Sequence, residues 1–118
     1  MADHARTGEG LSLSDQHHIP LLAYAPGTLP PSINQVVDSQ VDPVPTILGL
    51  LQLKARHASW GRDLGEVSKD QEFAVSVVGD EVRWRDSRYL LNDTLTDHPP
   101  LLFDLTKDPD CNTDVWRQ

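Results

Sequence analysis

Two short clusters of metal-binding and acid–base side chains stand near the start of the chain. The first is Asp3-His4, and the second is His17-His18, which directly precedes an apolar run. A carboxylate oxygen with an imidazole nitrogen is a donor pair that suits zinc or manganese. Adjacent side chains on a regular strand point to opposite faces, so Asp3 and His4 can both reach one ion only at a turn or a strand end. By themselves these residues are more typical of a solvated loop than of a metal site.

The composition argues against several classes of partner. The 118 residues amount to one domain, and 38% of them are hydrophobic. A formal charge of −8 argues against binding to nucleic acid or to an anionic membrane surface. No apolar run approaches the roughly 18 residues of a membrane-spanning helix. Residues 1–18 lack the basic start and apolar middle of a signal peptide, so a cytoplasmic protein is expected if the chain is complete.

The first half of the chain is expected to supply one buried strand and one helix. After a polar loop at residues 5–18, the run Ile19–Ala25 is short, apolar and ended by Pro-Gly, which favours a strand buried on both faces. A further short strand is expected at Gln35–Val37. The best helix runs from Asp42 to Leu53, with Asp42 as N-cap and a proline at the first helical position. Its apolar stripe predicts an amphipathic helix docked on a core.

The second half predicts an antiparallel meander. Residues 73–78 and 81–85 alternate in polarity around Gly79-Asp80, which is a hairpin signal. Strands are also expected at Tyr89–Leu91 and Leu101–Leu105, giving four strands with one polar face. The tail from Cys111 to Gln118 is expected to be loose, with Trp116 as its anchor. The fold class is therefore α+β, with one main helix and a small antiparallel C-terminal sheet.

Several short motifs follow one another in an order that points to a known family. They are Ala-Asp-His at 2–4, His-Ile-Pro-Leu-Leu at 18–22, Ser-Gln-Val-Asp at 39–42, Gly-Arg-Asp-Leu at 61–64, Leu-Phe-Asp-Leu at 102–105 and Lys-Asp-Pro at 107–109. Each motif is weak alone, but their order and spacing cover nearly the whole chain. The chain resembles the C-terminal part of the sulfatase branch of the alkaline phosphatase superfamily, closest to its lipoteichoic-acid-synthase-like phosphoglycerol transferases.

The resemblance implies roles for particular residues. It implies that residues 1–66 are a remnant of a catalytic α/β domain and that residues 67–118 form the C-terminal meander. Asp3 and His4 match ligands of the family's divalent metal, which is Zn, Mn, Mg or Ca. His18, and less clearly His17, matches a position near the phosphate or sulfate of the substrate. A polar pair opening a strand remains the alternative for these histidines. The helix-opening motif at 39–42 and the edge-covering motif at 61–64 are implied to be structural.

The family's nucleophile and its remaining carboxylate ligands have no counterpart in this sequence. A metal-activated nucleophile needs three or more protein ligands, so weak or no metal binding and no hydrolase activity are expected from this chain alone. Three hypotheses follow. The chain is an inactive segment of a hydrolase or transferase, one half of a split enzyme with an upstream catalytic polypeptide, or a small non-catalytic binding and assembly module. A homodimer or larger assembly is expected, and a periplasmic or extracellular-facing location if the parent is membrane-anchored.

Overall fold

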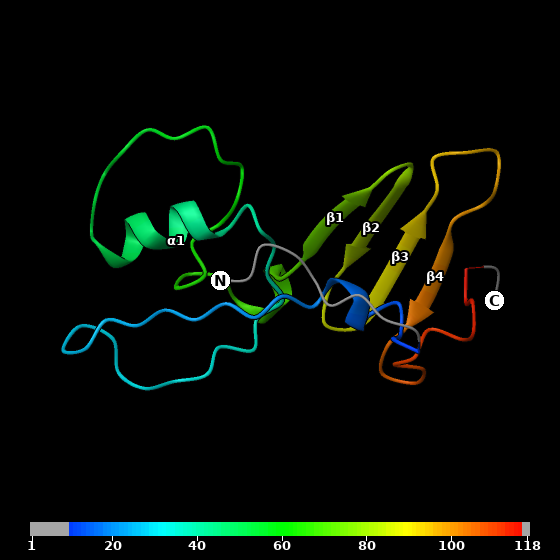
Figure 1. The fold of residues 1–118 in the computed structure, drawn as a ribbon, viewed down its shortest axis with the longest axis horizontal. Coiled ribbons are helices and arrows are strands. Elements are labelled where there is room, and N and C mark those ends of the chain that lie inside the picture. Colours follow the sequence, from blue (N-terminus) through cyan, green and yellow to red (C-terminus); the bar gives the residue numbers. More distant parts are fainter. Residues whose placement is uncertain (1–9, 117–118) are drawn as a thin grey trace.

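The computed structural model describes residues 10–116 and forms an elongated molecule of 48 × 29 × 28 Å (Figure 1). A four-stranded sheet lies at one end, and a single α-helix lies at the other with two long connecting segments. The elements are η1 (Asp15–His17), α1 (Pro43–Leu50), η2 (Lys69–Gln71), β1 (Ala74–Val78), β2 (Glu81–Arg85), β3 (Tyr89–Asp93) and β4 (Leu101–Asp104). The predicted α+β class with one main helix and a small antiparallel sheet is confirmed.

The sheet is the antiparallel meander that the alternating pattern predicts. Its strand order is β1-β2-β3-β4, and Val78 pairs with Glu81 across a two-residue turn. Gly79 opens that turn with φ of 59°, a left-handed conformation that costs glycine little and most other residues more. The hairpin therefore forms where the Gly-Asp pair interrupts the two alternating runs.

The polar face of the sheet is the one that the N-terminal segment covers. Ser76, Arg83 and Asn92 lie in one row across three strands. Residues 11–18 lie over this face, where Gln16 accepts a hydrogen bond from Arg83. The small core lies on the same face, because Leu90 and Phe103 pair there and are 3% and 5% exposed. This face therefore carries polar and buried apolar side chains together, and the N-terminal segment covers it.

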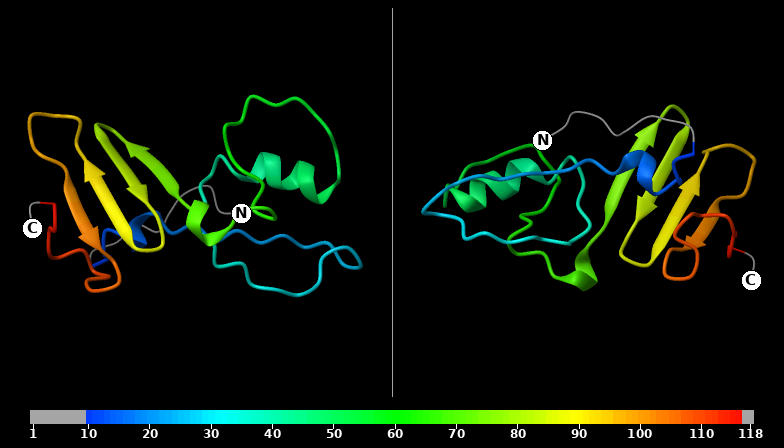
Figure 2. Two further views of the ribbon diagram at one scale, coloured as in Figure 1. Left: turned by 180° about the vertical axis from the view of Figure 1, so that it is seen from behind. Right: turned by 60° about the horizontal axis from the view of Figure 1, so that its bottom comes forward.

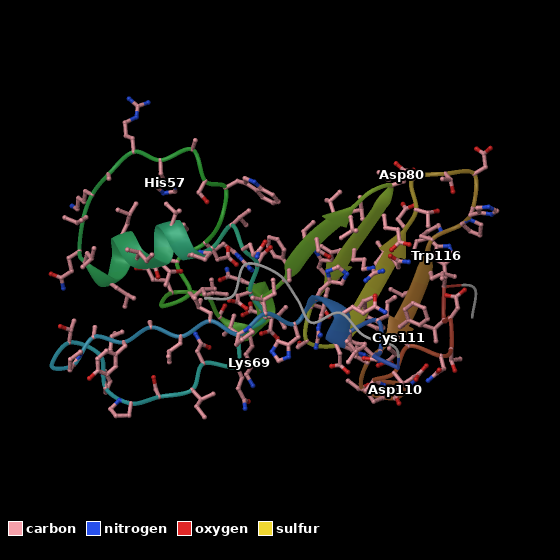
Figure 3. The ribbon with its side chains drawn as sticks, viewed as in Figure 1. His57, Lys69, Asp80, Asp110, Cys111 and Trp116 are labelled. Atoms are coloured by element: carbon pink, nitrogen blue, oxygen red, sulfur yellow. The ribbon has the colours of Figure 1, made fainter. Side chains whose placement is uncertain are left out.

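The C-terminal tail is tied to the sheet rather than loose. Val115 N donates to the Leu102 carbonyl at 2.7 Å, and Leu102 N donates to Asp114 Oδ1 at 3.0 Å. Figure 3 shows Trp116 beside the sheet, but its side chain is 47% exposed and is not the main anchor. The expectation of a loose tail is wrong for the described residues up to 116, because backbone and Asx hydrogen bonds hold it.

The predicted strand at Ile19–Ala25 is absent, and so is the short strand at Gln35–Val37. Residues 18–40 instead make a long excursion that runs out and back beside the α1 end of the molecule (Figures 1 and 2). Leu22 and Tyr24 are 83% and 85% exposed. The apolar composition predicts a strand, but a buried strand needs a ladder partner on both sides, and this segment has none within the described chain.

The helix is shorter than predicted and does not dock on a core. It ends at Leu50 because Gln52 adopts φ of 54°, and Leu53 N donates to the Leu48 carbonyl at 2.9 Å. This is a Schellman ending without the usual glycine. Val44 and Ile47 on its apolar stripe are 49% and 54% exposed, and no α1 residue is buried. The prediction of a docked amphipathic helix is therefore wrong in this structure.

Among residues 10–116, the structure contains no helix with the length and apolar character needed to cross a bilayer.

Candidate functional site

A groove of about 930 Å³ lies between the N-terminal segment, the turn before α1 and the first two strands. Its walls come from residues 13–19, Leu21, residues 37–41 and Pro43, and its floor comes from β1, β2 and Leu90 of β3. Both predicted substrate-binding residues, His17 and His18, line this groove. The fold therefore brings them together with side chains that are distant in sequence, including two arginines of β2.

Arg83 is the most connected polar side chain of the groove. Its Nη2 donates to Glu81 Oε2 at 2.6 Å, its Nε donates to Asn92 Oδ1 at 3.1 Å, and its Nη1 donates to Gln16 Oε1 at 3.3 Å. The Arg83 side chain is only 12% exposed. Its guanidinium thus joins the N-terminal segment to two other side chains of the sheet and acts mainly as a structural group.

Arg85 lies two residues along the same strand and on the same face. Its Nη1 donates to Ser14 Oγ at 2.5 Å. Its Nε is buried and has no hydrogen-bond partner in the part of the chain that the structure describes. A buried donor without a partner is costly, so this corner of the groove has hydrogen-bonding capacity that the described protein atoms leave unused.

The two histidines differ in their surroundings. Burial lowers the pKa of His17 below its ordinary value, the nearby positive charge of Arg83 lowers it further, and Glu81 opposes both effects. His17 therefore favours the neutral imidazole, which can donate one hydrogen bond and accept another. His18 is exposed at the rim. The sequence alone favoured His18 as the better match, whereas His17 is the more enclosed of the two.

Asp38 contributes a carboxylate to the opposite wall. Burial raises its pKa, the neighbouring Asp42 carboxylate raises it further, and its own backbone N–H and the charges of Arg62 and His18 partly offset the rise. The groove consequently combines guanidinium, imidazole and carboxylate groups rather than one sign of charge. Such a mixture can hold a small polar group through several hydrogen bonds.

Two of the three serines that line the groove have hydroxyls engaged in structural contacts. Ser39 Oγ donates to the Val75 carbonyl at 3.0 Å, and Ser14 Oγ accepts from Arg85. The described hydrogen bonds place neither Ser14 nor Ser39 beside a histidine base.

A buried ion pair next to the groove joins the two motifs at 39–42 and 61–64. Asp42 is 1% exposed, and its Oδ2 accepts from Arg62 Nη2 and from Ser39 N, both at 2.8 Å. Arg62 N donates to Asp42 Oδ1 at 2.7 Å, and the guanidinium also donates to the Gln71 and Phe73 carbonyls. We refer to this Asp42–Arg62 pair and its backbone contacts as the clasp. Asp42 precedes α1 as predicted, but its carboxylate serves the clasp instead of capping the helix.

Sequence reasoning missed the arginines of the groove and the partner of Asp42. The Arg-Trp-Arg alternation at 83–85 places both arginines on one face, and this signal was present in the sequence. Nothing in the sequence indicated which segment would cover that face.

The predicted metal ligands Asp3 and His4 lie outside the described residues. Within residues 10–116, no cluster of three or more His, Cys, Asp or Glu side chains is arranged to hold a metal ion. The part of the molecule that is described therefore does not by itself fit a closed site for the divalent metal that the resemblance implies.

The chain was compared with known proteins. No model of a known protein family matches it, and no curated protein matches it significantly.

Proposed function

We propose that this chain is the C-terminal segment of a metal-dependent hydrolase or transferase of the sulfatase and phosphoglycerol-transferase type, and that it is inactive by itself. The observation that carries the proposal is the exposed apolar run at residues 19–25. The side chains of Leu22 and Tyr24 are each more than four-fifths exposed to solvent. They belong to a stretch whose composition favours a strand. A segment that belongs inside a larger sheet has this character when its neighbouring strands are on another part of the protein.

The clasp also supports the proposal. The segments at 39–42 and 61–64 were identified separately, by their likeness to two structural motifs of one family. In the fold they contact each other through the Asp42–Arg62 pair. Two motifs that match one family in order and also contact each other in the fold are stronger evidence for that family than two unrelated tetrapeptides.

The groove gives this segment a role in binding. In the parent protein, His17 and His18 would face the phosphate or sulfate of the substrate, as the resemblance implies. Asp3 and His4 would add a carboxylate and an imidazole to a metal whose other ligands lie on an upstream catalytic polypeptide. When bound, that metal would activate the nucleophile of the upstream polypeptide.

Turnover assays test the proposal directly. The isolated chain, supplied with Zn²⁺, Mn²⁺, Mg²⁺ or Ca²⁺, should not hydrolyse p-nitrophenyl sulfate or phosphate above background. Calorimetric titration with Zn²⁺ and Mn²⁺ should give weak binding, because two ligands do not make a closed site. Turnover by the purified chain that disappears in His4→Ala would overturn the proposal.

A second assay has a positive readout. Inorganic phosphate or sulfate at millimolar concentration should shift the imidazole NMR signals of His17 and His18. His57 serves as the internal control, since it lies on the loop beyond α1, far from the groove (Figure 3). Equal shifts at all three histidines would indicate a general salt effect and would contradict the assignment of the groove.

A further inference from the structure

The second face of the sheet carries a continuous apolar surface. Cross-strand pairing places Val75, Trp84, Leu91 and Leu102 in one row across all four strands, with Val77 and Val82 beside it. We call these six side chains the apolar row. Val77 is 64% exposed and Trp84 is 36% exposed. The apolar row therefore presents a strip of side chains to solvent on the sheet face opposite to Arg83 and Arg85, although Val75 and Val77 of the edge strand β1 also border the groove.

No helix of the described chain covers the apolar row. The N-terminal segment lies on the other face, where Ser14 and Gln16 contact the arginines of β2. Figures 1 and 2 place α1 at the far end of the molecule from the sheet. A sheet normally buries its apolar face against a second layer of helix or sheet. This layer is missing for the apolar row within residues 10–116.

The charges around the apolar row indicate which partner fits. Residues 74–116 contain nine acidic and four basic side chains, a net charge of −5. Asp80 and Asp93 lie at one side of the row, near Val77 and Val82, and no Lys or Arg of the described chain pairs with them. On the other side, Asp104 is shared by Arg88 and Lys107. A partner that covers the row must therefore bring positive charge to the Asp80 and Asp93 side.

A second copy of this chain is a poor occupant. It would face the same net charge of −5, and like charges brought together are costly. A stable dimer also needs on the order of 800 Å² and 20 or more residues from each partner, whereas the row offers six side chains. A single helix fits better. Four strands at spacings of about 4.8 Å span roughly 14 Å, which about ten helical residues cover.

We propose that the apolar row is a docking site for a cationic amphipathic helix. The apolar stripe of that helix packs across Trp84 and Leu91, and Lys or Arg side chains on its flank meet Asp80 and Asp93. The proposal goes beyond the function proposed above, because it concerns the sheet face opposite to Arg83 and Arg85 and needs no catalytic partner.

The test uses a synthetic 14-residue peptide of Leu and Lys with Leu at helical spacing, and its Leu and Glu counterpart. Binding to the full chain is followed by amide NMR shifts and by the fluorescence of Trp84 in a Trp60→Phe, Trp116→Phe background. The Lys peptide should shift residues of β1–β4 and move Trp84 emission to shorter wavelength. Its affinity should fall as salt increases, since exposed charges are screened.

Val77 and Val78 provide a matched pair of variants. They are adjacent and 64% and 59% exposed, but they lie on opposite faces of β1. Val77→Lys should weaken binding of the Lys peptide at least about tenfold, through lost burial and charge repulsion. Val78→Lys should change it little. Asp80→Lys, in the exposed turn, should also weaken binding without touching an apolar contact.

Four outcomes would overturn the proposal. They are equal losses in Val77→Lys and Val78→Lys, equal binding of the Leu and Glu peptide, amide shifts centred on α1, and no binding at millimolar peptide. None of them bears on the turnover and phosphate assays, so the two proposals fail independently.

Discussion

At the scale of single residues, the clasp contains the least exposed ion pair among the described residues. Asp42 is 1% exposed, and the Arg62 side chain is 19% exposed. Burial alone would raise the pKa of Asp42, but the hydrogen bonds from Arg62 and Ser39 outweigh it and hold the pKa below its ordinary value. Arg62 also stacks over the Phe73 ring, with its guanidinium carbon 3.9 Å from the ring centre. One arginine thus joins the start of α1 to the start of the sheet.

Removal of Arg62 should destabilise the protein severely. Arg62→Ala leaves the Asp42 carboxylate buried without a counter-charge, which typically costs about 3–5 kcal/mol. Urea unfolding followed by circular dichroism measures the loss. Arg88→Ala is the control, because the Arg88 side chain is 54% exposed and the buried Asp104 carboxylate keeps Lys107 and Thr106 as partners, so this variant should cost less. Similar losses in the two variants would show that the clasp is not a major source of stability.

The ionisation of His17 should report its position in the groove. Its pKa should lie below 6.5, and Arg83→Gln should raise it, whereas Glu81→Gln should lower it further. A depressed histidine pKa means that the unfolded chain binds the proton more readily. This contribution to stability is therefore present above about pH 6.5 and is lost as pH falls below it. Imidazole NMR titration measures the pKa, and a His17 pKa above 6.5 would contradict its half-buried placement beside Arg83.

At the scale of elements, the segment that follows the loop after α1 packs closely against the turn before α1. A methyl group on Gly61 would overlap the Val41 carbonyl. Ser59 Oγ donates to that same carbonyl at 2.6 Å, and Leu64 N donates to Thr46 Oγ1 at 3.0 Å. These contacts fix where Arg62 enters the clasp.

Gly61→Ala should therefore shift the backbone and weaken the clasp. Overpacking of this kind costs about 1–3 kcal/mol. Gly65→Ala is the control, since its new methyl group would meet only the Asp63 carboxylate at 3.3 Å, at the end of a side chain that can move. Thermal unfolding of both variants tests this, and a Gly61→Ala protein as stable as wild type would refute the close approach.

The elements that could be predicted are those that local sequence determines. The β1–β2 hairpin follows from alternation and from Gly79, so its register needed no distant information. The strand predicted at Ile19–Ala25 is absent because a strand needs a pairing partner, which the local sequence pattern does not specify. The end of the helix was predicted wrongly because Gln52 adopts a left-handed conformation in which glycine is the usual residue. For the candidate site, the histidines were found by position in the sequence, while Arg83 and Arg85 required knowledge of which face is covered.

At the scale of the whole molecule, much apolar surface remains in contact with water. Only Leu90 and Phe103 are buried hydrophobic residues among those described, whereas Leu22, Tyr24 and Ile33 are more than 80% exposed. Burial of such surface is worth about 25 cal/mol per Å². This observation favours the assembly module as a second candidate function, with residues 19–33 as the associating segment.

Self-association through this segment should depend on its apolar side chains. The wild-type chain should sediment as a dimer or larger species at micromolar concentration, and Leu22→Ser with Tyr24→Ser should shift it toward the 13.2 kDa monomer. Leu95→Ser is the control, because Leu95 is 67% exposed on the loop between β3 and β4. A wild-type chain that remains monomeric at all concentrations would contradict this second candidate.

The clasp has a consequence for how the chain tolerates added sequence. Asp42 and Arg62 close the base of an excursion that contains α1 and the loop after it, and residues 51–58 of that loop are all exposed. Exposed loops with closed ends are where inserted segments and even whole domains are best accommodated. A reporter domain placed between Lys54 and Ala55 would project away from the sheet, its entry and exit held together by Arg62 and the buried Asp42 carboxylate. The chain therefore offers a ready attachment point that leaves both the groove and the apolar row untouched.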